Sequence, residues 1–165
     1  NNRIEGSIPL TIGTLQTAEL LDLELNFLSG PIPAEIKGLV SLRELRLGQN
    51  LFTGTIPSTL SQLENLEILS LALNGFETSI TTELATMPAL RVLDLNSASL
   101  TGNFPTQFVT FASLEVLNLS GNRLTGSLPG SGWNGMDALT DLHLGGNQFS
   151  GTLPGAIADA VNLGT

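Results

Sequence analysis

The sequence predicts a solenoid, a stack of similar coils whose short strands form one parallel β-sheet along a curved face. The main observation is a motif of about 24 residues that recurs along the whole chain of 165 residues. The second is the alternation in each copy, as in Leu45-Arg46-Leu47, which points two leucines inward and the residue between them outward. One such strand cannot bury its apolar face alone, so stacked copies must share a continuous core.

A column of asparagines sets the period of the repeat. Its members stand 24 residues apart, and 25 apart at the last step: Asn2, Asn26, Asn50, Asn74, Ala98 in place of asparagine, Asn122 and Asn147. A carboxamide can bond main-chain groups that would otherwise be buried unpaired. We therefore expect a structural ladder in which each asparagine ties its own coil to the next: Asn26, Asn50, Asn74, Asn122 and Asn147.

Each asparagine is followed by a turn and a return segment. A glycine stands four residues later and a proline seven residues later in every copy except one, which has Thr78 and Thr81. Glycine allows a turn without a side-chain penalty, and proline ends the hydrogen-bonding edge. Segments such as 34–39 are then expected to return along the far side as short helical or 3₁₀ turns.

Two departures from the repeat predict local irregularity. Ala98 has no carboxamide, so we expect the ladder to be interrupted there and the backbone to open most readily over residues 96–101. In the next repeat one residue is inserted, and Trp133 takes a position that leucine usually holds.

The pattern L-x-L-x-x-N-x-L-(S/T)-G-x-I-P resembles the plant-type leucine-rich repeat. The resemblance covers residues 1–165 as a single array of about seven repeats, which we expect to be truncated at both ends because the chain begins and ends inside a repeat, the last one at Val161-Asn162-Leu163. It implies a right-handed curved solenoid with a parallel sheet on the concave face and short 3₁₀ or helical turns on the convex face. It also implies a second short strand at the (S/T)-G-x-I-P element. Family members are receptor-kinase ectodomains, receptor-like proteins and secreted inhibitors of cell-wall-degrading enzymes, which implies an extracellular or cell-surface location.

Composition argues against several classes of partner. Fifteen acidic residues against six basic ones give a net charge of −9, whereas binding of nucleic acid or of an anionic membrane requires a concentrated Lys/Arg surface. No apolar run approaches the roughly 18 residues of a membrane span, so we expect no direct membrane insertion by this segment. Cysteine is absent from the sequence, which excludes disulfides and thiolate metal sites within it.

Residues that flank the inward leucines are the positions that the repeat leaves free for recognition. They form three columns with neighbours roughly 4.8 Å apart, in which the expected partner-binding residues are Arg46, Ile68, Ser70, Val92, Asp94, Val116, Asn118, Asp141 and His143. Ile68, Val92 and Val116 place an apolar run on three consecutive strands, which marks a contact site or follows from the preference of β-branched residues for strands.

Catalytic and metal chemistry are not predicted. His143 lies near Asp94, Asn118 and Asp141, but a flat column points side chains in parallel, whereas zinc needs three or four convergent ligands. No cleft is expected around Asp22 and Glu24. We therefore predict no enzyme activity, no cofactor and no metal. Asn118-Leu119-Ser120 is an N-x-S sequon, so Asn118 is a possible glycosylation site in a secreted protein, or an ordinary product of the repeat.

Three functions remain open at this point. The first is recognition of a protein or peptide through the concave face, as part of a larger cell-surface or secreted protein. The second is a structural scaffold packed permanently in a larger assembly. The third is binding of a polysaccharide, mineral or ice surface, against which the variable central column and the lack of aromatic stacking platforms argue.

Overall fold

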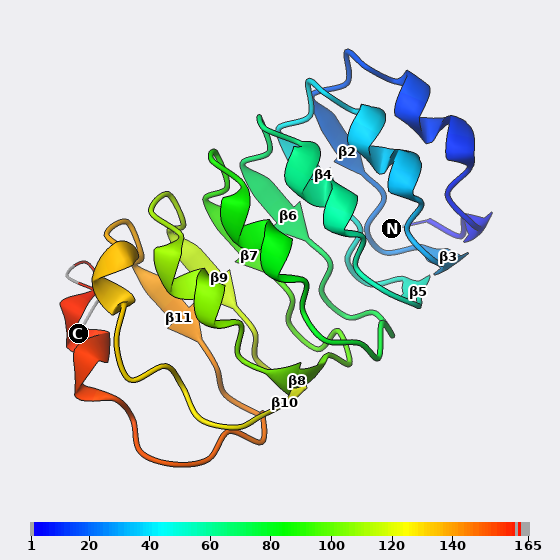
Figure 1. The fold of residues 1–165 in the computed structure, drawn as a ribbon. Helices are drawn as coiled ribbons and strands as arrows, with labels where there is room; N and C mark the ends of the chain where they lie inside the picture. The colour runs from blue at the N-terminus through cyan, green and yellow to red at the C-terminus, as the bar shows by residue number, and fades with distance from the viewer. Residues whose placement is uncertain (1, 161, 163–165) are drawn as a thin grey trace.

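The computed structural model describes residues 2–160 and 162, which form a stack of coils arranged in an arc (Figure 1). A typical coil contains one short strand of the concave sheet, a turn at the asparagine position and a 3₁₀ segment on the opposite side, and several coils have a second short strand after the turn. Val161 and Leu163, where the sequence predicts the start of a further repeat, lie outside the described residues. No helix among the described residues is long and apolar enough to cross a membrane.

Within residues 2–160, the concave face is a six-stranded parallel sheet that follows chain order along the array. Its strands are β2 (Leu20–Asp22), β4 (Glu44–Arg46), β6 (Ile68–Ser70), β7 (Val92–Asp94), β9 (Val116–Asn118) and β11 (Asp141–His143). Paired residues are 24 apart at every step except the last, where Val116 lies beside Asp141. The inserted residue is therefore absorbed before β11, and the sheet keeps its register.

The opposite, convex face consists of 3₁₀ segments, as the sequence predicts. These are η1 (Leu10–Thr14), η2 (Ala34–Gly38), η3 (Ser58–Gln62), η4 (Thr82–Thr86), η5 (Thr106–Thr110), η6 (Trp133–Gly135) and η7 (Gly155–Asp159). Most of these segments follow a proline. The carbonyl of that proline accepts a hydrogen bond from the backbone N–H three residues later, as Pro33 does from Ile36 at 3.1 Å. A proline fits this position because its φ is already close to that of a helical turn.

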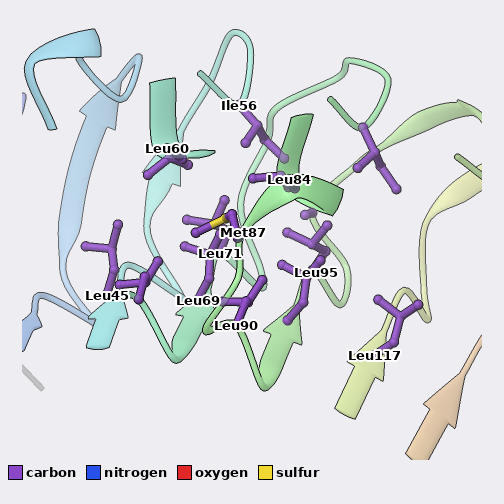
Figure 2. Packing of buried hydrophobic residues seen from close by; sticks show 14 of the residues in the cluster. Leu45, Ile56, Leu60, Leu69, Leu71, Leu84, Met87, Leu90, Leu95 and Leu117 are labelled. Carbon is purple, nitrogen blue, oxygen red and sulfur yellow. The ribbon is translucent and has the colours of Figure 1, made fainter. Parts of the chain in front are cut away.

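The core fills the space between these two faces. Leu45, Leu69, Leu93 and Leu117 point inward from successive strands and are fully buried. Figure 2 shows several of them packed against residues of the return segments, such as Leu60 and Leu84. Because each coil buries its leucines mainly against its neighbours, the core continues along the whole array.

A second parallel sheet runs along the flank where each coil turns after the asparagine, and we call it the flank ribbon. It consists of β1 (Glu5–Gly6), β3 (Phe27–Gly30) and β5 (Leu51–Phe52), followed separately by β8 (Thr101–Asn103) and β10 (Arg123–Thr125). The family resemblance implies such strands at (S/T)-G-x-I-P, whereas these strands begin up to two residues earlier and end before the proline. Between β5 and β8 only the isolated bridges Thr53–Gly75 and Ser79–Thr101 remain.

The asparagine side chains tie each coil to the coil before it. The Oδ1 of Asn50 accepts the backbone N–H of Leu28 at 3.0 Å, and its Nδ2 donates to the carbonyl of Leu23 at 2.9 Å. Asn74 makes the equivalent bonds to Phe52 and Leu47. The sequence predicts bonds to the asparagine's own coil and to the following coil. The bonds within the coil are present, as from Nδ2 of Asn50 to the carbonyl of Leu47 at 3.1 Å. The predicted direction between coils is wrong, because the carboxamide bonds the preceding coil.

This direction changes what the missing asparagine at Ala98 affects. An asparagine there would accept the N–H of Phe76 in the preceding coil, which instead donates to the main-chain oxygen of Ala98 at 3.2 Å. The N–H groups of Ala98 and Leu100 are both accepted by Oδ1 of Asn122, at 3.0 and 2.9 Å. From these bonds we expect the weakest segment in the preceding turn, around Phe76, rather than at residues 96–101, where the sequence predicts it.

Trp133 occupies the buried leucine position at the inserted residue. It is fully buried, and its Nε1 donates to the carbonyl of Pro129 at 2.9 Å. Its ring lies 5.7 Å from that of Phe104, which in turn packs edge-on against Phe108. Aromatic rings thus replace aliphatic side chains in two adjacent coils.

Candidate binding surface

The structure brings the predicted concave residues together on the solvent side of the sheet. The first column contains Leu20, Glu44, Ile68, Val92, Val116 and Asp141, and the central column contains Asp22, Arg46, Ser70, Asp94, Asn118 and His143. The outward side chains of the four middle strands, β4, β6, β7 and β9, are half-buried. The outward side chains of the end strands β2 and β11 are exposed. Each predicted residue therefore has direct neighbours on the adjacent strands.

The apolar centre of this surface is the run Ile68, Val92 and Val116. Paired in register on β6, β7 and β9, these side chains shield one another and remain partly open to solvent. Glu44 and Asp141 end the run on either side. A short apolar strip with charged ends can exclude water from a small contact area.

Polar contacts within the surface order the side chains around this strip. Nε and Nη2 of Arg46 donate to one carboxylate oxygen of Glu44, at 3.2 and 2.8 Å. Oδ1 of Asp94 accepts the backbone N–H of Asn96 at 3.0 Å, and Asp22 does the same with Glu24. The aspartates are thus held in place by their own strands, and the arginine is neutralised by its neighbour.

A third column lies just beyond the strands, and a glycine shapes it. Oε1 of Glu24 accepts a hydrogen bond from Oγ of Ser70 at 2.7 Å, two coils away. Gly48 lies between them, where a Cβ would stand 2.9 Å from that same Oε1. The missing side chain at Gly48 therefore leaves room for Glu24 to cross the intervening coil.

Alternating charges line the edge where the chain enters the concave strands. Glu19, Arg43, Glu67, Arg91 and Glu115 occupy equivalent positions one coil apart. Arg43 contacts Glu67 at 2.6 Å, and Arg91 makes two hydrogen bonds with Glu115 at 2.8 and 2.9 Å. The hydrogen bond from Arg91 lowers the pKa of Glu115, and that bond raises the pKa of Arg91. These glutamates hold the arginines in place beside the sheet.

Asn118 sits on β9 in the middle of the concave sheet. Its Oδ1 accepts hydrogen bonds from the hydroxyl of Ser120 at 2.6 Å and from the Ser120 N–H at 3.2 Å. Its Nδ2, the atom to which an N-linked glycan attaches, has no hydrogen-bond partner among the described residues. A glycan at Asn118 would cover the part of the concave face beside Val116.

Chemistry that requires converging groups finds no support in this arrangement. Within residues 2–160 and 162, no group of three or more His, Asp or Glu side chains is placed to hold a metal ion. His143 and Asp141 point from the same face of an exposed end strand, as parallel neighbours.

Sequence reasoning missed an apolar patch formed by residues of the turn before the asparagine and by the first residues of the flank-ribbon strands β3 and β5. Its members are 40–56% exposed: Leu25, Phe27, Leu51 and Leu73. Leu51 and Leu73 line a shallow hollow of about 410 Å³ that opens beside Gly75 and Ser97. The signal was present in the sequence, because the equivalent positions in the C-terminal coils hold glycine, serine, arginine or glutamine.

Two of these leucines also adopt an unusual backbone conformation. Leu25 and Leu73 have φ values of 59° and 55°, where the last two coils have Gly121 and Gly146 at 68°. A left-handed conformation costs an L-residue roughly 1–2 kcal/mol. The turn before the asparagine therefore imposes this conformation whatever residue it contains.

Comparison with known proteins agrees with this geometry. Models of the family described as leucine-rich repeat match residues 88–149 and, separately, residues 41–63, which together make up more than half of the chain. The chain belongs to the leucine-rich-repeat family. Its repeats are of the plant type, as the solved structures below also indicate. No curated protein sequence matches the chain at a significant level.

Several solved leucine-rich-repeat structures resemble this one. The plant peptide hormone receptor RGFR1, solved in complex with RGF2, is 33% identical over 96% of this chain, with a TM-score of 0.90. The Arabidopsis receptor kinase HAESA, solved with the peptide hormone IDA and the co-receptor SERK1, is 31% identical over 99% of the chain, with a TM-score of 0.93. The chain spans only 25% and 27% of those two structures. A plant ice-binding protein is 31% identical over 94% of this chain and 57% of its own, with a TM-score of 0.75.

Proposed function

We propose that this leucine-rich-repeat array is a non-enzymatic module that recognises a protein or peptide through its concave sheet. In this proposal it forms part of a larger cell-surface or secreted protein. The observation that carries the proposal is the half-exposed run of Ile68, Val92 and Val116 at the centre of a solvent-facing sheet. Binding energy at interfaces concentrates in a few central residues that lose their water, surrounded by polar groups that contribute less.

The receptor structures support this proposal by analogy. RGFR1 and HAESA were solved with peptide hormones bound, and both share the repeat architecture at more than 30% identity. An extracellular location follows for this chain if it serves the same kind of role. A fold by itself does not specify a function, so the site residues must be tested directly.

Panning a random peptide library on the immobilised chain tests the proposal. Val92→Lys places a charge at the centre of the concave face, and we expect it to abolish capture of the selected peptides. The matched control is Glu83→Lys, which introduces the same side chain on the convex turn η4, where Glu83 is exposed. Both variants should unfold at nearly the same urea concentration as the original chain, because both side chains face outward.

The opposite pattern of losses would move the interface. If the selected peptides still bind Val92→Lys but are lost with Glu83→Lys, the concave proposal fails. A convex interface of that kind would favour the alternative role as a scaffold packed within a larger assembly. Native mass spectrometry of the chain with its binding proteins would then distinguish a permanent assembly from a transient one.

A second candidate, binding of a regular surface such as ice, is favoured by the similarity to the plant ice-binding protein. The concave columns vary too much for a repeating lattice, but five of the seven equivalent positions on the flank, all except Glu5 and Glu77, carry a hydroxyl group: Ser29, Thr53, Thr101, Thr125 and Ser150. Inhibition of ice recrystallisation tests this candidate. Activity that disappears in the double variant Thr53→Lys, Thr125→Lys and survives in Val92→Lys would support it, and no activity in the original chain would eliminate it.

A further inference from the structure

We infer that the concave sheet selects an extended segment in which basic and apolar side chains alternate. This inference rests on the proposed function and adds the chemistry of the partner. It follows from two features of the surface: where its uncompensated charge lies, and how that charge is placed beside the apolar strip.

The arginines on and beside the concave sheet are neutralised within the chain. Arg46 is paired with Glu44 at 2.8 Å, Arg43 with Glu67 at 2.6 Å, and Arg91 with Glu115 at 2.8 Å. None of them is therefore free to attract an acidic partner. Their pairing also means that they do not offset the remaining carboxylates of the sheet.

The aspartates of the same face have no such compensation. Among the described residues, no cationic side chain lies within 4.0 Å of Asp22, Asp94 or Asp141. The three concave columns together contain five carboxylates and one arginine, so the face is acidic beyond its internal pairs. A partner with positive charge is attracted to this face and an acidic one is repelled.

The position of the aspartates relative to the apolar strip determines the pattern. Val92 and Asp94 are two residues apart on β7, so they project from the same face of the sheet in adjacent columns. A segment that crosses the strands along the array lies between the two columns. In an extended chain, successive side chains point to opposite sides, so every second residue meets the apolar column and the others meet the central column.

The distances are compatible with this alternation. Asp22 and Asp94 are separated by three strand steps of the sheet, or about 14 Å at the usual spacing between strands. An extended chain covers that distance in about four residues. Residues four apart in an extended chain point to the same side. Two basic residues with this spacing can therefore meet both Asp22 and Asp94.

Three eight-residue peptides of matched length serve as probes: alternating Val and Lys, alternating Val and Glu, and a peptide with four Val followed by four Lys. Fluorescence anisotropy with the full chain should show the alternating Val/Lys peptide binding about tenfold more tightly than the Val/Glu peptide. It should also bind several-fold more tightly than the block peptide, which has the same composition and charge. Its affinity should decrease as salt is raised, since salt screens exposed charges.

Variants at both columns test the placement. Asp94→Asn and Asp22→Asn should each weaken binding of the Val/Lys peptide several-fold, whereas Asp159→Asn, the same change on the convex turn η7, should leave it unchanged. At the apolar strip, Val92→Lys should weaken binding far more than Val92→Glu, because only the lysine repels a basic segment. Equal losses in those two variants would show that charge sign does not matter at the strip.

The inference is overturned if the Val/Glu or the block peptide binds as tightly as the alternating Val/Lys peptide. It is also overturned if Asp94→Asn has no effect or if none of the three peptides binds. Failure of the proposed function is recognised separately, by the panning experiment with Val92→Lys and Glu83→Lys. Peptides from the random library that are lost with Val92→Lys but are acidic or uncharged would leave the concave site in place and remove only the basic partner.

Discussion

The two sheets of this solenoid respond differently to irregular repeats. The concave sheet runs without interruption from β2 to β11, although Ala98 replaces an asparagine and an extra residue precedes β11. The flank ribbon breaks between β5 and β8, in the coil where Thr78 replaces the glycine. The concave sheet therefore remains continuous despite irregular repeats, whereas an irregular repeat divides the flank ribbon into two parts.

The difference reflects what holds each sheet together. Inward leucines lie directly beneath the concave strands and are fully buried in β4, β6, β7 and β9, so packing maintains the register of these strands whatever the turn contains. The ribbon depends on the turn itself, where Gly54 and Gly102 adopt φ values of 80° and 83°. A β-branched threonine strongly disfavours that region, and the positive φ falls on Glu77 instead, at 49°. Core packing thus maintains the register of the concave sheet, whereas the pairing of the flank-ribbon strands depends on which residue occupies each turn.

Of the changes predicted here, removal of a ladder asparagine should lower the free energy of unfolding most. Asn122 accepts the N–H groups of Ala98 and Leu100 and donates to the carbonyl of Leu95. Asn122→Ala should lower the free energy of unfolding by about 1–3 kcal/mol, the scale of leaving buried polar groups unpaired, as measured by urea titration. The control Asn103→Ala, at an exposed position of β8, should be nearly neutral. Equal losses at both positions would refute the role of the ladder.

A smaller effect is expected at the break in the ribbon. The amide of Phe76 donates to the Ala98 oxygen at 3.2 Å, whereas the equivalent amide of Phe52 donates to the buried carboxamide of Asn74 at 3.0 Å. Native-state hydrogen exchange should therefore be several-fold faster at Phe76 than at Phe52. The amide of Leu100, accepted by Asn122, should resemble Phe52. If Leu100 exchanges fastest of the three, the weakness follows Ala98 itself.

The smallest effect concerns the charged edge of the concave sheet. The folded state lowers the pKa of Glu115 through its hydrogen bond with Arg91, so ionised Glu115 stabilises the fold above the ordinary glutamate pKa of about 4.3. That contribution is lost as the pH falls through the lowered pKa. The melting temperature of Glu115→Gln should be slightly below that of the original chain at pH 7, and the two should converge in acid. Glu64→Gln, at an exposed position without an ion pair among the described residues, should show no such convergence.

Much of the candidate site was predictable from the sequence because the repeat has a constant length. Equivalent residues one repeat apart must lie on adjacent strands, so the register of Ile68, Val92 and Val116 followed from counting. The partners of the charged side chains did not follow. Arg46 pairs with Glu44 on its own strand rather than across the sheet, because both project from the same face two residues apart.

The direction of the ladder was also beyond sequence reasoning. An asparagine column is equally compatible with bonds to the preceding or to the following coil, and only the turn geometry places the Asn50 carboxamide beside Leu28. The apolar patch of Leu25, Phe27, Leu51 and Leu73 was overlooked for a related reason. In the sequence these side chains resemble core positions, but Leu25 and Leu73 lie in a left-handed turn, Phe27 and Leu51 begin flank strands, and all four are exposed.

Periodicity therefore established the solenoid, its inward leucines and the columns on its concave face, since these depend only on spacing along the chain. The tertiary structure decided which charges are neutralised, which coil each asparagine ties and where the ribbon breaks. Those properties depend on contacts between coils, such as the hydrogen bond from Ser70 to Glu24 across Gly48. Contacts of that kind depend on side-chain direction and available space, which repeat spacing does not specify.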